Sequence, residues 1–215
     1  MKLYLVLHGE TEEMRRGVRL GHLAKLSRDG HKQAKIVAKR LFKIHFDKIF
    51  CSPTLRAKET ARIIMSRKNK KTTKYTELPE LVERKEPSKF IGTSTNKFPW
   101  DYFKKHRLNR NWRYDDGESF NDIFARVKKV LAIFAHESPN NIILAVSHSS
   151  ITRAIFAYVM MRNKLTPRQY YDLTEKVGVF PTGITVLEYN QKIFESHPTW
   201  KLISWMDRSH LDIAK

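Results

Sequence analysis

Short apolar runs alternate along the chain with longer stretches in which apolar residues recur every three or four positions. The runs at 3–7 and 141–147 are the clearest, and continuous apolar runs of this length are typical of strands buried on both faces. The other strand patterns lie at 46–52, 74–78, 183–189 and 199–206, of which the last two are expected to form a closing pair.

Helical periodicity fills the stretches between these strands. In the first of them Ala34, Val37 and Leu41 fall on one face, as in an amphipathic helix that packs on a sheet. In the second, Ser52 is expected to cap the helix and Pro53 to occupy its first position. Helices are predicted at 27–44, 52–64, 149–161 and 166–177, and from Glu118 to about residue 134.

Strands that alternate with helices predict an α/β fold. We expect a three-layer sandwich, in which a mainly parallel central sheet carries helices on both faces. The 215 residues suffice for one domain with a sizeable core and are few for two, so a single domain is predicted over 1–215. The segment at about 79–117 mixes prolines, charges and aromatic residues, and we interpret it as an insertion that covers one face.

The charge balance indicates an anionic partner. The chain has 41 lysines and arginines against 22 acidic residues, a net charge of +19, which attracts phosphorylated metabolites, nucleic acids or acidic membranes. The densest basic run, RKNKKTTK at 67–74, lacks the interleaved aromatic residues of single-strand binders. We therefore interpret this run as a solvated loop, and nucleic-acid binding as the weaker hypothesis.

Cysteine content and hydropathy bear on the cellular compartment, on membrane association and on metal binding. The single cysteine, Cys51, has no partner for an internal disulfide, which fits a reducing cytoplasm. His8 and Glu10 interrupt the first apolar run, and no run is long enough to span a membrane, so neither a signal peptide nor a membrane partner is expected. No Cys/His pair has zinc spacing, and we expect no metal.

Polar side chains follow three of the predicted strands. His8 comes after the first, Ser52 and Arg56 after the second, and Ser147 and His148 at the end of the run at 141–147. Parallel strands place their carboxyl ends at one edge of the sheet, where ligands bind in such folds. The sequence therefore predicts a site at this edge.

These motifs resemble those of the histidine phosphatase superfamily, which has the phosphoglycerate-mutase-like fold. Residues 7–11 (LHGET) are similar to the family's Arg-His-Gly-Glu-Thr, and residues 52–61 (SPTLRAKETA) match its Ser-Pro-x-x-Arg-Ala-x-x-Thr-Ala. Residues 146–150 (VSHSS) resemble Val-Ser-His-Gly-Gly, and shorter matches lie at 81–83 (LVE) and 117–119 (GES). The motifs keep the family's order and spacing across essentially the whole chain.

The resemblance implies a metal-independent phosphatase that needs no cofactor. His8 matches the histidine that attacks the phosphoryl group and is transiently phosphorylated. Arg56 and His148 match side chains that hold the phosphoryl oxygens, and Glu83 matches the proton donor to the leaving oxygen. Further substrate contacts are expected from Gly9, Thr11 and Ser149.

Leu7 departs from the family pattern. The arginine expected there is a second clamp on the phosphoryl group, and the loss of one such stabiliser typically costs ~3 kcal/mol, or roughly 10²–10³ in rate. Met14 also replaces an asparagine of the mutase-type members. We therefore expect an active phosphatase with reduced turnover, unless Arg15, Arg16 or Arg19 fills the vacant corner.

Two alternatives stay open at this point. A catalytically silent phosphate-binding or regulatory protein would explain Leu7, and a phosphoglycerate-mutase-type transferase would use the same histidines. The expected partner is a phosphorylated small molecule or a phosphoprotein, and the oligomeric state is left open. The cover suggests a polyanionic or aromatic-bearing substrate, although a basic amphipathic cover without substrate contacts is the simpler interpretation. Its basic residues are Lys89, Lys97, Lys104, Lys105, Arg107, Arg110 and Arg113, interspersed with Phe90, Trp100, Tyr102 and Trp112.

Overall fold

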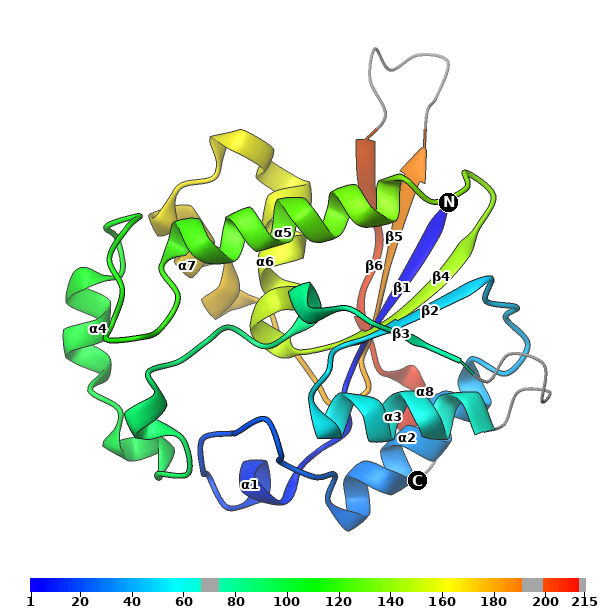
Figure 1. The fold of residues 1–215 in the computed structure, drawn as a ribbon, viewed down its shortest axis with the longest axis horizontal. Coiled ribbons are helices and arrows are strands. Elements are labelled where there is room, and N and C mark those ends of the chain that lie inside the picture. Colours follow the sequence, from blue (N-terminus) through cyan, green and yellow to red (C-terminus); the bar gives the residue numbers. More distant parts are fainter. Residues whose placement is uncertain (67–73, 191–198, 213–215) are drawn as a thin grey trace.

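A six-stranded sheet forms the centre of the fold (Figure 1). The computed structural model describes residues 1–66, 74–190 and 199–212, so the basic run at 67–74 lies almost entirely outside the described residues. The strands are β1 Lys2–Leu7, β2 Lys48–Cys51, β3 Thr76–Glu77, β4 Ile142–Ser147, β5 Ile184–Asn190 and β6 Thr199–Asp207. Their order is β3-β2-β4-β1-β5-β6; the first four pair in parallel, and β5 and β6 close the sheet antiparallel. The predicted mainly parallel sheet and closing pair are confirmed.

Helices cover both faces of this sheet. The α-helices are α1 Glu12–Arg15, α2 Arg28–Arg40, α3 Leu55–Ser66, α4 Trp100–His106, α5 Phe120–Ala135, α6 Ser149–Met161, α7 Pro167–Lys176 and α8 Ser209–Asp212. Figure 1 shows α2 and α3 below the sheet and α5, α6 and α7 above it. The three-layer α/β sandwich predicted from the sequence is therefore confirmed.

Side-chain alternation along the inner strands divides the core into two layers. Leu3 and Leu5 of β1 pack with α5 and α6, whereas Val6 packs with α2 and α3. In β4, Ile143 and Leu144 separate between the layers in the same way. Successive residues of a strand point to opposite faces, so continuous apolar runs fill both layers at once.

The start of α3 differs from the prediction. The helix begins at Leu55, three residues after Ser52, so Ser52 is not its N-cap and Pro53 is not its first residue. The short hydrogen bond of the Ser52 hydroxyl is the 2.7 Å one with His148 Nε2, and its bond from the amide of Thr54, ahead of the helix, is long at 3.4 Å. The amide of Lys58 donates to the carbonyl of Thr54, which closes the first turn.

The predicted cover segment at 79–117 consists of 3₁₀ turns and one short helix. The turns are Pro79–Leu81, Ser88–Phe90 and Thr95–Lys97, followed by α4. In Figure 1 this segment lies to the left of the sheet, on the side to which β1, β2 and β4 point. It therefore stands beyond the carboxyl ends of the parallel strands, where the predicted site lies.

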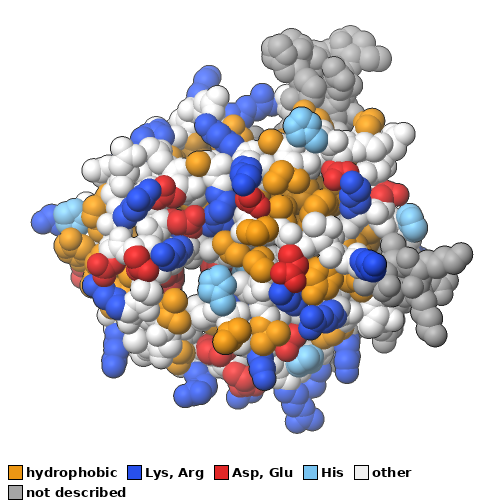
Figure 2. Space-filling model, in the orientation of Figure 1, with side chains coloured by type: hydrophobic (Ala, Val, Ile, Leu, Met, Phe, Trp, Pro, Cys, Tyr) orange, Lys and Arg blue, Asp and Glu red, His pale blue; other side chains and the backbone are white. Residues whose placement is uncertain are grey.

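Basic side chains are spread over the visible face of the molecule, with acidic ones between them (Figure 2). Within the described ranges, no helix has the length and apolar character needed to cross a membrane. The excess charge is therefore distributed on this face rather than gathered in one patch.

Candidate active site

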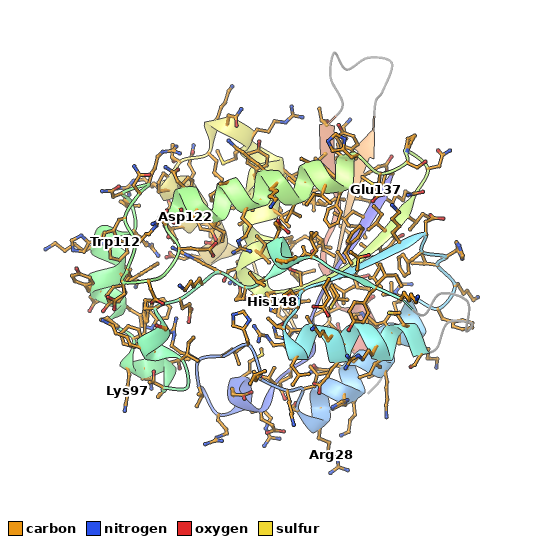
Figure 3. The ribbon with its side chains drawn as sticks, viewed as in Figure 1. Arg28, Lys97, Trp112, Asp122, Glu137 and His148 are labelled. Carbon is orange, nitrogen blue, oxygen red and sulfur yellow. The ribbon has the colours of Figure 1, made fainter. Side chains whose placement is uncertain are left out.

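Three strand ends meet at one edge of the sheet. Leu7 lies opposite Ser147 in the parallel pairing of β1 and β4, and the amide of His8 donates to the carbonyl of Ser147 at 3.1 Å. β2 pairs with the other edge of β4 and brings Ser52 alongside. The ring centroids of His8 and His148 are consequently 5.1 Å apart, near the centre of the molecule (Figure 3). The predicted meeting of the two histidines is confirmed.

His8 is held in one tautomer. Its Nδ1 donates to the carbonyl oxygen of Gly9 at 2.7 Å, because that oxygen can only accept. Its Nε2 therefore carries the lone pair, and it accepts a 3.1 Å hydrogen bond from Nε of Arg56. Burial, followed by the charge of Arg56, lowers the pKa of His8 to about 3, against the opposing effect of the Gly9 carbonyl. His8 is thus a neutral imidazole with an oriented lone pair.

His148 lies behind His8 and is fully buried. Its Nε2 is hydrogen bonded with the hydroxyls of Ser52 at 2.7 Å and Thr54 at 3.2 Å. Its Nδ1 has no hydrogen-bond partner among the residues that the structure describes. Burial first, and then the charge of Arg56, lowers the pKa of His148 well below its usual value. The neutral imidazole of His148 therefore keeps one buried ring nitrogen without a partner among the described residues, and the residue does not itself border the cavity.

The two buried imidazoles of the site predict a pH-dependent stability, to which His210, also buried with a lowered pKa, adds. Below pH ~6.5 the unfolded chain binds protons at both histidines, whereas folded His8 and His148 stay neutral, so the free energy of unfolding falls as the pH falls. The loss approaches about 1.4 kcal/mol per pH unit for each imidazole and continues toward the lowered pKa of His8, about 3.

Urea unfolding at intervals between pH 7.5 and about 5 measures this effect, because depressed carboxyl pKa values such as that of Asp116, about 2, act at lower pH. His148→Gln should remove part of the slope, whereas the exposed control His45→Gln should keep it. Equal slopes in the wild type and His148→Gln would contradict the assignment.

Arg56 projects from the first turn of α3 and is buried at the cavity floor. Besides its contact with His8, its Nη1 donates to the carbonyl of Gly21 at 2.8 Å. Burial lowers its pKa, partly offset by the charges of Glu83 and Glu13. The guanidinium is thus held by two hydrogen bonds, with its Nε–H edge toward His8.

Gly9 and Thr11 lie outside the cavity and stabilise the chain that follows His8. The amide of Gly9 donates to Thr60 Oγ1 at 3.1 Å, and a Cβ on Gly9 would lie 2.7 Å from the carbonyl oxygen of Gly30. The hydroxyl of Thr11 caps α1 by accepting from the amide of Met14. Neither residue borders the cavity, and their predicted contact with substrate stays a prediction.

Glu83 is fixed at the start of α6. It accepts hydrogen bonds from the hydroxyl of Ser149 at 2.9 Å and from the amides of Ser150 at 3.0 Å and Arg84 at 2.8 Å. The hydroxyl of Ser149, which the sequence predicts to contact substrate, is therefore bound to a carboxylate in this structure. Three nearby glutamates form ion pairs: Glu77 with Lys58, Glu80 with Lys129 and Glu86 with Arg19.

A cavity of about 880 Å³ opens over these residues. His8, Arg56, Glu83 and Ser149 line it, and Leu7 borders it beside His8. Within the described part of the chain, no group of three or more His, Cys, Asp and Glu side chains is placed to hold a metal ion. The arrangement combines a neutral imidazole, a guanidinium and a carboxyl group around one space.

Sequence reasoning missed several supporting contacts. Ser52 and Thr60 belong to the motif at 52–61, so the sequence places them near the site but does not reveal their hydrogen-bond partners. The Gly21 carbonyl, which binds Arg56, carries no signal in a sequence, because every residue has such a group.

Comparison with known proteins identifies the family of this chain. Residues 3–198 match the histidine phosphatase superfamily, branch 1. The chain belongs to the histidine phosphatase superfamily. The resemblance of the strand-end motifs is therefore confirmed.

Individual members of the superfamily are distant from this chain. A probable phosphatase of Schizosaccharomyces pombe is 25% identical over 218 residues, which cover 99% of this chain and 96% of that protein. Phosphoserine phosphatase 1 of Hydrogenobacter thermophilus is 30% identical over 161 residues, 74% of this chain and 76% of that protein. A mutant Entamoeba histolytica phosphoserine phosphatase, crystallised with phosphoserine, shares the fold with a TM-score of 0.78 at 24% identity, covering 98% of each chain.

Proposed function

We propose that this histidine phosphatase homologue hydrolyses phosphomonoesters through transient phosphorylation of His8. The observation that carries the proposal is the state of that imidazole, which is neutral, fixed at Nδ1 and directed by its Nε2 lone pair toward Arg56 at the cavity floor. A neutral, oriented imidazole is a competent nucleophile, and covalent transfer divides one difficult displacement into two easier ones.

In the first step the Nε2 lone pair of His8 forms a bond to phosphorus, and the bond from phosphorus to the ester oxygen breaks. Glu83, in its protonated form, gives its proton to the leaving oxygen. Arg56 turns from Nε2 to the phosphoryl oxygens, and Nδ1 of His148 is the ring nitrogen left to donate to them. In the second step water attacks phosphorus and loses a proton to Glu83, and the electron pair returns to Nε2.

The substrate is proposed to be a phosphorylated small molecule. A cavity of about 880 Å³ falls within the range of small-molecule sites. A phosphoprotein stays the alternative within the same chemistry. Because the side chains themselves supply the nucleophile, cation and acid, we propose that the reaction needs no metal or cofactor. The lone cysteine supports a cytoplasmic location for what we take to be one domain over 1–215.

One observation favours a second candidate, a silent phosphate-binding protein. Leu7 lines the cavity beside His8 and offers no donor to a phosphoryl oxygen. Such a protein would bind phosphate analogues without turning over any ester.

Hydrolysis of 4-nitrophenyl phosphate by the purified protein tests the choice. We expect phosphate release that EDTA leaves unchanged and that millimolar vanadate abolishes, because vanadate mimics the five-coordinate transition state in the pocket of Arg56. Strong inhibition by EDTA would contradict the metal-free mechanism, and indifference to vanadate would contradict the anion pocket. Vanadate binding without hydrolysis at any pH between 4 and 9 would favour the silent protein.

A further inference from the structure

Large apolar side chains border the opening of the cavity. Met14, Ile91 and Trp100 are 39%, 44% and 47% exposed, and all three line the cavity. They come from α1, from the residue after the second 3₁₀ turn and from the start of α4. Apolar side chains that are exposed together around one opening indicate a surface that binds an apolar part of a ligand.

Backbone hydrogen bonds fix this apolar rim in place. The amide of Arg19 donates to the carbonyl of Thr93 at 2.9 Å, and the amide of Gly92 donates back to the carbonyl of Arg19 at 3.0 Å. The amide of Thr95 donates to the carbonyl of Gly17 at 2.8 Å. The loop after α1 and the cover are thus joined, and the rim is formed before substrate arrives.

Arg19 stabilises this junction instead of offering its charge to an anionic substrate. Its guanidinium lies 4.1 Å from the ring centroid of Phe98 and 5.4 Å from that of Trp100, and it is paired with Glu86. A cation held against two rings and a carboxylate is not free to bind a second phosphate.

The other cations that line the cavity also have partners. Lys85 pairs with Asp116, and Arg126 pairs with Glu118. Arg84 donates to the hydroxyl of Tyr171 and to the carbonyl of Glu118. Among the lysines and arginines that line the cavity, Arg56 is the one in contact with the nucleophile. The cavity is therefore organised around one phosphoryl group.

The basic residues of the cover beyond Arg84 and Lys85 face elsewhere. None of the seven lysines and arginines between positions 89 and 113 lines the cavity, and Figure 3 shows Lys97 at the outer edge, away from His148. Three of them pair with surface carboxylates: Lys89 with Asp115, Arg107 with Glu175 and Arg113 with Asp122. The polyanionic substrate considered from the sequence thus loses its support.

We propose that the substrate is a monoester with a single phosphate on an apolar or aromatic body, which lies against Met14, Ile91 and Trp100. This inference rests on the proposed phosphatase function. It adds the chemical class of the leaving group, which the fold and the nucleophile do not specify.

A series of 4-alkylphenyl phosphates tests the proposal. These esters all release phenols of nearly equal acidity, so their intrinsic reactivity is nearly the same. Differences in kcat/KM therefore report contacts between the protein and the alkylphenyl part of the substrate. From phenyl to 4-butylphenyl phosphate we expect kcat/KM to rise by up to about fourfold for each methylene that is buried. O-phosphotyrosine, which releases a similar phenol but carries two charges on its body, should be a poorer substrate than 4-ethylphenyl phosphate.

Two variants locate the effect on the rim. Trp100→Ala and Ile91→Ser should each flatten the rise, whereas Leu108→Ala should keep the wild-type slope. Leu108 is an exposed apolar residue of the same segment that does not line the cavity.

The outcomes separate the two proposals. Equal kcat/KM across the series, or a preference for O-phosphotyrosine, would overturn the apolar substrate class while hydrolysis itself continued. A rise that Trp100→Ala and Ile91→Ser both leave unchanged would overturn the assigned surface. Failure of every ester to show His8-dependent hydrolysis would instead overturn the phosphatase function.

Discussion

Replacing His8 with alanine is expected to lower kcat for 4-nitrophenyl phosphate by at least about 10³-fold, because the covalent route is lost with the nucleophile. His8 lines the cavity in a fixed tautomer with its Nε2 lone pair bonded to Arg56, and Arg56 and Glu83 line the same cavity. Steady-state rates at equal enzyme concentration measure the change. Brief incubation with a ³²P-labelled ester and acid-free quenching should also trap label on the wild type that is stable to base and lost in acid.

His45→Ala is the matched control, because it removes an exposed imidazole of the same chain and should keep both rate and label. Circular dichroism establishes that the His8 variant is folded. Undiminished hydrolysis in a folded His8→Ala protein would show that another group attacks phosphorus. A labelled protein whose label persists in acid would point to the same conclusion.

Changing Leu7 to arginine is expected to raise kcat by about 10- to 100-fold. Leu7 is buried beside His8 and lines the cavity, so a longer side chain at this position can reach the phosphoryl group. One preorganised donor to transition-state charge is typically worth 10²–10³ in rate, and the proximity of Arg56 offsets part of that gain. The measurement is kcat for a small ester such as phenyl phosphate, where contacts with the rim are few.

Leu7→Met is the control for a change of size without charge, and its kcat should stay within a few-fold of the wild type. The three arginines considered as replacements do not fill the position in the structure. Arg15 pairs with Glu12, Arg16 is exposed, and Arg19 is paired with Glu86. A fall in kcat on introducing arginine would show that one of them moves into the corner when substrate binds.

The fold and the meeting of the histidines were accessible from the sequence because both depend on local patterns. Continuous apolar runs such as Leu3–Leu7 fix buried parallel strands, and parallel strands must end at one edge. The start of α3 was predicted wrongly because local capping rules favoured Ser52, whereas its hydroxyl is bonded to His148, 96 positions away. A contact of that kind leaves no trace in a window of neighbouring residues.

The cavity walls were less predictable for the same reason. The number of cations in the cover was visible in the sequence, but their directions were not. Arg113 and Arg84 look alike as letters, yet one lies in a surface ion pair with Asp122 and the other lines the cavity. Direction depends on which carboxylates and carbonyls the folded chain brings near, and these lie far along the polymer.

The bond from Arg56 Nε to His8 Nε2 has a consequence for chemical selectivity. While it persists, the only basic electron pair of the ring is shielded, so neutral alkylating or acylating reagents that enter the pocket find no reactive centre. An incoming dianion competes for the guanidinium and uncovers that pair in the same movement. In the proposed mechanism, the nucleophile is therefore uncovered only by the kind of dianionic group that it attacks.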